Sequence, residues 1–267
     1  MPAIQPARLK KQVIELVDCF AQPPRFRSRL HDLYALYASR AHRIPQGLNA
    51  HTLIPCYELP PPVTHQVENE LHPFCQADPP AALALADTLW ADDTLEVRLL
   101  AIHILGVTPP SPPEAVTERL FAWLGNVEDE ALLDALLEKG AAGVRRDQPA
   151  LWWAKVKNWL SSLETRSQRL GLRAAASLLA GDDFHDLPSV YALISPLIYP
   201  VRPELKSALE EALQALARRS PAETVYFLKQ MLLISPDPAT PRLVRRCLPF
   251  FEGEWRASLQ AALRTPI

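Results

Sequence analysis

The sequence predicts an all-α fold, a right-handed α-solenoid of HEAT-like helical hairpins that form an armadillo-type superhelix. Composition is the first indication, because 27 prolines and 8 glycines in 267 residues suit many short helices that begin or end at proline. The second is an apolar pattern with helical spacing in each long segment. The third is a repeat: in "EVRLLAIHILG", "GLRAAASLLAG" and "VRRCLPFFEG", a glycine follows an arginine by 8 residues.

The length of the repeat follows from the three aligned arginines Arg98, Arg173 and Arg245, which lie 75 and 72 residues apart. Each interval holds two helix pairs, so one repeat spans about 36–38 residues, close to the range of HEAT-type hairpins. Because one hairpin cannot bury both of its faces, neighbouring hairpins are expected to stack. We expect one solenoid over residues 1–267, with N-terminal helices in 1–45, a proline-rich connector and a helix in 46–78, and HEAT-like repeats in 79–264.

The helices can be assigned in chain order. The first 20 residues predict an amphipathic helix, and a second helix is expected at 63–75, after the connector. Five segments then each predict a helix pair: 79–106 with a break at 92–94, 111–144 with a break near 125–126, 148–181 with a break near 161–165, 202–233, and 240–264. In the first pair, the apolar stripes consist of Leu85, Leu89, Trp90, Val97, Leu100, Ala101, Ile104 and Leu105.

Several helix starts carry capping signals. Ser111 and Ser220 each begin a Ser-x-x-Glu capping box with proline at the first helical position. Thr240 precedes Pro241 and predicts a similar cap without the glutamate.

Charge is distributed unevenly along the chain. Residues 1–50 carry 8 basic and 3 acidic side chains, residues 51–140 carry 3 and 15, and residues 141–267 carry 17 and 12. Only the middle third would repel a polyanion, so binding of nucleic acid by the basic ends is permitted but not required. Solvated helix faces explain the same imbalance equally well.

Cysteine usage and hydropathy indicate a cytoplasmic protein with no membrane partner. Cys19, Cys56, Cys75 and Cys247 show no paired spacing and are expected to be reduced thiols. No apolar run approaches the ~20 residues that a membrane-spanning helix needs, and the charged N-terminal helix is not a signal peptide. We expect a monomer.

No motif predicts a cofactor or a metal. With so few glycines, the chain has neither a phosphate-binding loop nor a dinucleotide fingerprint, and it lacks the usual serine hydrolase and zinc protease motifs. Cys56, His65, His72 and Cys75 could be imagined around an ion, but their spacing matches no closed zinc motif, so packing is the preferred interpretation.

Tryptophans gather in one helix of the 148–181 pair. Trp152, Val156 and Trp159 have the spacing of a helix core. Trp153 points about 100° away and is the one member of the group that is expected near the surface.

Basic residues collect in the C-terminal half. If the second helices of the hairpins line the concave side, Arg173, Lys206 and Arg245 would present charge along one groove and contact a phosphate backbone, with Arg145 and Arg146 nearby. The alternative is that each arginine pairs with a carboxylate between adjacent hairpins. For Arg98, in an acidic segment, this structural alternative is preferred; for Arg173, both interpretations stay open.

From about residue 52 to 250, the chain resembles the HEAT-like repeat alkylpurine DNA glycosylases, the DNA alkylation repair family, as a divergent member. The resemblance rests on segments that keep their order and spacing: "LIPCYELPPPVTHQVENEL", "LADTLWADDTLEVRLLAIHIL", "WLSSLETRSQRLGLRAAASLL" and "LKSALEEALQALARRSPAETVYFL". It implies a helical solenoid that grips damaged duplex DNA in a positive groove and cleaves the N-glycosidic bond of alkylated purines.

The resemblance also implies roles for single residues. The family's catalytic aspartate, which supports positive charge on the sugar, corresponds to Asp134, and a phosphate-contacting arginine corresponds to Arg173. The two tryptophans that contact the lesion in the family correspond to Glu130 and Glu211, so both are missing.

Three functions follow as hypotheses. The first is a DNA-binding solenoid that contacts the phosphates of double-stranded DNA through its basic side chains, and it is the one that we adopt. The second is an active DNA glycosylase that uses Asp134. The third is a non-catalytic scaffold that binds a protein partner, the usual task of HEAT-like arrays.

Overall fold

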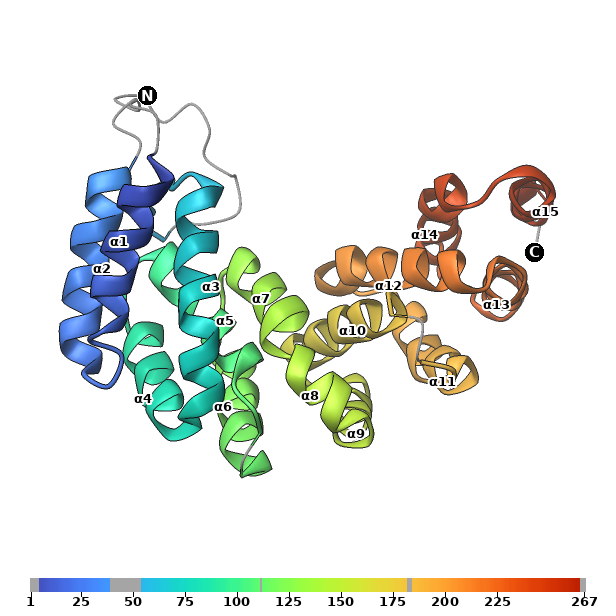
Figure 1. Ribbon diagram of the computed structural model, residues 1–267. Coiled ribbons are helices and arrows are strands. Elements are labelled where there is room, and N and C mark those ends of the chain that lie inside the picture. Colours follow the sequence, from blue (N-terminus) through green and yellow to red (C-terminus); the bar gives the residue numbers. More distant parts are fainter. Residues whose placement is uncertain (1–4, 39–53, 111, 182–183, 265–267) are drawn as a thin grey trace. The chain divides into compact units, whose positions relative to one another are not determined.

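The computed structural model describes residues 5–38, 54–110, 112–181 and 184–264, and all regular elements in these residues are helical (Figure 1). The predicted all-α fold is confirmed. The chain divides into two compact units, Met1–Pro149 and Ala150–Ile267. The expected single array over 1–267 stays a prediction. Ser111 and residues 46–53 of the expected connector lie outside the described part of the chain.

The first unit is built from two layers of helices. One layer contains α1, α3, α5 and α7, which contact one another in this order, and α2 packs against α4 in the other layer. The helices are α1 (Pro6–Val17), α2 (Pro23–Tyr37), α3 (Pro61–Ala77), α4 (Pro79–Trp90), α5 (Leu95–Val107), α6 (Pro113–Asn126), α7 (Glu130–Ala135), the π-helix η1 (Leu136–Gly140) and α8 (Ala142–Asp147).

The second unit repeats this arrangement. Helices α10, α12 and α14 contact one another in order, and α11, α13 and α15 do the same. The helices are α9 (Pro149–Leu160), α10 (Thr165–Leu179), α11 (Leu187–Ile198), the 3₁₀ turn η2 (Pro203–Leu205), α12 (Lys206–Arg219), α13 (Pro221–Ile234), α14 (Ala239–Cys247), the 3₁₀ turn η3 (Leu248–Phe250) and α15 (Gly253–Arg264). Within each unit, alternate helices therefore stack as the predicted hairpins require.

Contacts between hairpins follow the predicted repeat. In the second unit, side-chain hydrogen bonds join residues 33 to 37 positions apart: Tyr191 to Thr224, Arg219 to Phe184, Val201 to Asp237, and Arg202 to Thr165. These separations lie close to the repeat of about 36–38 residues expected for HEAT-type hairpins.

Proline opens many of these helices, as the composition suggested, and aspartate caps several of them. The carboxylates of Asp78, Asp129 and Asp186 accept hydrogen bonds from the first turns of α4, α7 and α11. Ser220 is the N-cap of α13 as predicted, but its side chain makes no capping hydrogen bond. The cap predicted at Thr240 is wrong, because α14 begins at Ala239 and the buried Thr240 hydroxyl lies 2.7 Å from that of Ser235.

The predicted core is largely observed. The apolar stripes expected in α4 and α5 are buried except at Trp90, which is half-buried. Trp152, Val156 and Trp159 are buried in α9 as predicted. Among the described residues, none of the helices is long and apolar enough to cross a membrane.

The cysteines are free thiols, and Cys19, Cys75 and Cys247 are buried while Cys56 is exposed. Burial raises the pKa of Cys75 and of Cys247 to about 12.

Candidate functional site

The second unit presents a row of basic side chains on the layer formed by α10, α12 and α14. On α10, Arg166, Arg169 and Arg173 recur at intervals of three and four positions, so they lie on one side of the helix. Helix α12 packs between α10 and α14, and ion pairs of Glu211 with Arg173 and of Glu210 with Arg246 join it to basic residues of both neighbours. We call these residues the arginine face: Arg166, Arg169, Arg173, Lys206, Arg242, Arg245 and Arg246.

Arg173 forms an ion pair within this face. Its Nε lies 3.4 Å from a carboxylate oxygen of Glu211 on α12. The side chain of Arg173 is 12% exposed, while that of Glu211 is 47% exposed. Of the two interpretations left open by the sequence, a pairing between adjacent hairpins is the one observed. Glu211, which the resemblance places at a tryptophan of the family, thus pairs with the arginine that the resemblance expects to contact phosphate.

The other members of the face differ in their surroundings. Arg245 and Arg242 are exposed on α14. The Nε of Arg246 lies 2.5 Å from Glu210 Oε1 on α12. Lys206 is half-buried at the start of α12. The exposed guanidinium groups of α14 are therefore better placed to contact a ligand than Arg173.

Arg145 and Arg146, which were expected to contact DNA, belong to the first unit. The guanidinium of Arg145 donates hydrogen bonds to the carbonyl oxygens of Leu137 and, at 2.8 Å, Glu138, so it caps the end of η1. Burial lowers the pKa of Arg145. The exposed Arg146 pairs with both carboxylate oxygens of Asp147, at 2.8 and 3.0 Å. Both side chains have local structural partners.

Asp134 is exposed on α7, which continues directly into η1. A π-helix is rare and is frequently found at functional sites. Gly106 of α5 permits its close packing, because a β-carbon at this position would lie 2.2 Å from the carbonyl oxygen of Lys139. Arg145 and Gly106 therefore hold the segment that follows Asp134.

A cluster of charged side chains joins α3, α5 and η1. Glu68 Oε1 lies 3.6 Å from Lys139 Nζ and 3.9 Å from His103 Nδ1. Burial lowers the pKa of His103, Lys139 and His72 lower it further, and Glu68 opposes them. His103 is therefore neutral at neutral pH, and Glu68 and Lys139 form the charged pair of this cluster.

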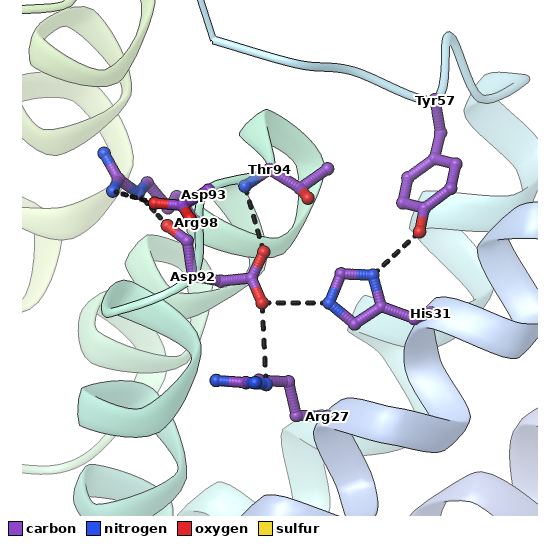
Figure 2. A network of polar contacts seen from close by, with 7 residues as sticks. All are labelled: Arg27, His31, Tyr57, Asp92, Asp93, Thr94 and Arg98. Carbon is purple, nitrogen blue, oxygen red and sulfur yellow. Dashed lines mark hydrogen bonds and ion pairs between the residues drawn. The ribbon is translucent and has the colours of Figure 1, made fainter.

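A second polar cluster lies where the connector, α2 and the turn between α4 and α5 meet (Figure 2). Asp92 is 7% exposed, and its carboxylate lies 2.9 Å from His31 Nε2 and 3.6 Å from Arg27 Nε. It also accepts a hydrogen bond of 2.9 Å from the amide of Thr94. His31 Nδ1 lies 2.7 Å from the hydroxyl of Tyr57. The two ring nitrogens of His31 thus join the carboxylate of Asp92 to the hydroxyl of Tyr57.

This Tyr–His–Asp arrangement has the contacts of a nucleophile, a base and an orienting acid. However, burial raises the pKa of Tyr57, and the negative charges of Asp92, Glu96 and Asp32 raise it further. Since these effects disfavour the phenolate, the cluster is poorly suited to nucleophilic catalysis. It ties the connector to the body of the first unit, and Glu96 adds to this by accepting hydrogen bonds of 2.8 Å from the amides of Tyr57 and Glu58.

Arg98 borders the same cluster. It donates to the carbonyl oxygen of Asp92, and a second guanidinium nitrogen lies 3.8 Å from Asp93. Its guanidinium carbon is 5.7 Å from the ring centre of Trp90, which stacks on Trp123 at 4.5 Å. These polar contacts are structural, as preferred for Arg98, but they lie within the α4–α5 hairpin and not between adjacent hairpins.

The remaining candidates show packing contacts. Trp153 is half-buried and meets Phe184 edge to face at 4.9 Å, and Lys157 Nζ lies 5.7 Å from its ring centre. Among the described residues, no group of three or more His, Cys, Asp or Glu side chains is arranged to hold a metal ion. The helical spacing of Arg166, Arg169 and Arg173 was visible in the sequence, whereas nothing there linked His31, Tyr57 and Asp92.

The chain is similar to a known protein family and to one solved structure. Residues 40–246 match the model of a family described as DNA alkylation repair enzyme. The crystal structure of smu.31 from Streptococcus mutans UA159 is similar, with a TM-score of 0.53 and 14% sequence identity over 71% of this chain and 98% of that chain. At this identity, the similarity concerns the fold alone. No curated protein sequence matches the chain significantly.

Proposed function

This chain belongs to the DNA alkylation repair enzyme family, and on this basis we propose that it binds double-stranded DNA through the arginine face. The observation that carries the proposal is the position of Arg242 and Arg245, exposed on α14 in the same layer as the arginines of α10. Guanidinium groups bind phosphate oxygens in a bidentate manner and stay charged at all physiological pH values.

The proposed contacts are to the backbone of DNA and not to its bases. A set of basic side chains, with arginines on α10 and α14 and Lys206 on α12, suits a ligand with regularly spaced negative charges. Phosphate contacts of this kind position a protein on a duplex without reading its sequence. We therefore expect binding that depends strongly on salt and little on sequence.

Charge reversal on α14 tests the proposal. Fluorescence anisotropy with a labelled duplex would measure the affinity of the wild type and of the double variant Arg242→Glu, Arg245→Glu at several salt concentrations. We expect the double variant to lose at least about tenfold in affinity and about two units of the salt slope, one for each phosphate contact. Arg256→Glu is the matched control, since Arg256 is exposed in the same unit but on α15.

The control should bind DNA almost as the wild type does. Equal binding by the wild type and the double variant would remove the proposed interface. Recovery of one stoichiometric protein partner, with no DNA binding by the wild type, would favour the scaffold function instead.

Base excision is a second candidate function, favoured by the π-helix that follows the exposed Asp134. The carboxylate would stabilise positive charge on the sugar as the N-glycosidic bond breaks. Incubation with alkylated DNA and measurement of released base tests this function. Release by the wild type that Asp134→Asn abolishes would support it, and release that Asp134→Asn leaves unchanged would remove the role of Asp134.

A further inference from the structure

Two consecutive glutamates of α12 contact different neighbouring helices. Consecutive residues of an α-helix point about 100° apart, and Glu210 and Glu211 use this difference to reach opposite sides. Glu211 pairs with Arg173 of α10 at 3.4 Å, and Glu210 pairs with Arg246 of α14 at 2.5 Å. The arginine face therefore contains its own counter-ions.

Exposure is reversed between the two pairs. In the first, the glutamate is the accessible partner, since the side chain of Glu211 is 47% exposed and that of Arg173 is 12% exposed. In the second, the arginine is accessible, since the side chain of Arg246 is 55% exposed and that of Glu210 is 18% exposed. A ligand that approaches from solvent therefore meets a carboxylate at one pair and a guanidinium at the other.

We propose that Glu211 is a displaceable counter-ion of Arg173, which gives way to a DNA phosphate, whereas Glu210 is a fixed counter-ion of Arg246. This inference rests on the proposed function. Glu211 can rotate into water and keep its charge solvated, so breaking its contact with Arg173 costs little. Arg173 stays in place and forms a charge-assisted contact with the phosphate instead.

The same exchange is unfavourable at the second pair. If Arg246 turned toward a phosphate, the largely buried carboxylate of Glu210 would lose its partner, and an uncompensated charge away from water is costly. The two glutamates thus have the same charge and adjacent positions but different consequences for DNA binding. Glu211 keeps affinity low because every bound duplex must displace it and tolerate its charge nearby.

Glu211→Gln and Glu210→Gln form a matched pair of variants with which to test this. With the labelled duplex, we expect Glu211→Gln to raise affinity by roughly tenfold, because the phosphate no longer has to displace a carboxylate from Arg173 or lie close to its charge. Glu210→Gln should raise affinity much less and should lower the melting temperature, because Arg246 loses its partner.

Introducing Glu211→Gln into an Arg173→Gln protein tests whether Glu211 affects DNA binding through Arg173. In an Arg173→Gln protein whose circular dichroism and melting match a folded chain, Glu211→Gln should raise affinity much less than in the wild type, because only the repulsion between Glu211 and the phosphates is left to remove. Equal gains from Glu210→Gln and Glu211→Gln, or no gain from Glu211→Gln, would overturn the inference while the effect of Arg242→Glu, Arg245→Glu still supported DNA binding. Absence of DNA binding by the wild type and by Glu211→Gln would overturn the proposed function and this inference together.

Discussion

The backbones of Gly106 and Lys139 approach so closely that a β-carbon on Gly106 would lie 2.2 Å from the carbonyl oxygen of Lys139. The opposing atom belongs to the backbone of η1 and cannot rotate away as a side chain could. Glycine at this position of α5 is thus required for η1 to pack where it does, directly after the helix that carries Asp134.

Gly106→Ala should therefore destabilise the protein by about 1–3 kcal/mol, the usual cost of forcing extra atoms into a packed site. Urea denaturation followed by circular dichroism would measure it. Gly125→Ala is the control, because a β-carbon there meets nothing within 4 Å. The control should be neutral or gain up to about 1 kcal/mol from better helix propensity. Equal stability of the two variants would show that η1 adjusts freely.

When Asp92 is replaced, the free energy of unfolding should depend less on pH in the acidic range. Burial raises the pKa of Asp92, but hydrogen bonds from His31 and Thr94 outweigh it and leave the pKa below its ordinary value of 3.8. A carboxyl group with a lowered pKa in the folded state stabilises the fold above pH 3.8, and this contribution is lost as pH falls through the lowered pKa.

Asp92→Asn should cost about 1–3 kcal/mol at neutral pH, because His31 and Thr94 lose a charged acceptor. Its unfolding free energy should then fall less than that of the wild type between pH 5 and about pH 2. The control is Asp93→Asn, since Asp93 is 99% exposed and only loosely paired with Arg98. A variant at Asp92 with the acid sensitivity of the wild type would contradict this assignment.

Arg145→Ala should destabilise the first unit without weakening DNA binding. Loss of the guanidinium leaves the carbonyl groups of Leu137 and Glu138 without these donors, at a cost of about 1–2 kcal/mol. Arg146→Ala removes an exposed side chain and should change stability by less than about 0.5 kcal/mol. Thermal unfolding and duplex binding of both variants would check this. If the folded Arg145→Ala variant lost affinity for DNA, that result would support the DNA contact that the sequence predicted for Arg145.

Glu58→Gly should stabilise the connector. Glu58 has a φ of 53°, a left-handed conformation that is unfavourable for a residue with a β-carbon and open to glycine. We expect a gain of about 0.5–1 kcal/mol in unfolding free energy. Glu58→Ala keeps the β-carbon and should give no gain. Both variants retain the backbone amide that donates to Glu96, so a difference between them reports the backbone conformation.

Helices were easier to predict from the sequence than the contacts between them. The breaks near residues 92–94, 125–126 and 161–165 are observed because local signals mark them. Helix α11 was not assigned, since its sequence is apolar on all sides and contains Pro196. Local spacing shows which residues share a helix side, but a tertiary partner depends on how hairpins stack.

The site illustrates this limit. Arg173 was an evident candidate, but its pairing with Glu211 depends on the register of α10 against α12, which no local pattern specifies. The contacts of His31 with Tyr57 and Asp92 join residues 26 and 61 positions apart. Of the contacts in that cluster, only the turn in which Asp92 accepts from the amide of Thr94 is marked by a local sequence pattern, Asp-x-Thr.

The reactivity of the cysteine thiols toward alkylating agents is of interest, because the chain belongs to a DNA alkylation repair enzyme family. Electrophiles that methylate DNA also attack cysteine, and they react with the thiolate form. Cys75 and Cys247 are buried, with a pKa of about 12, so they stay protonated and shielded from such reagents at neutral pH. The pKa of the exposed Cys56 is also raised, by burial and then by Glu96 and Glu58. Fewer thiolates are therefore present at these three positions at neutral pH than at an unperturbed cysteine, which lowers their reactivity toward electrophiles.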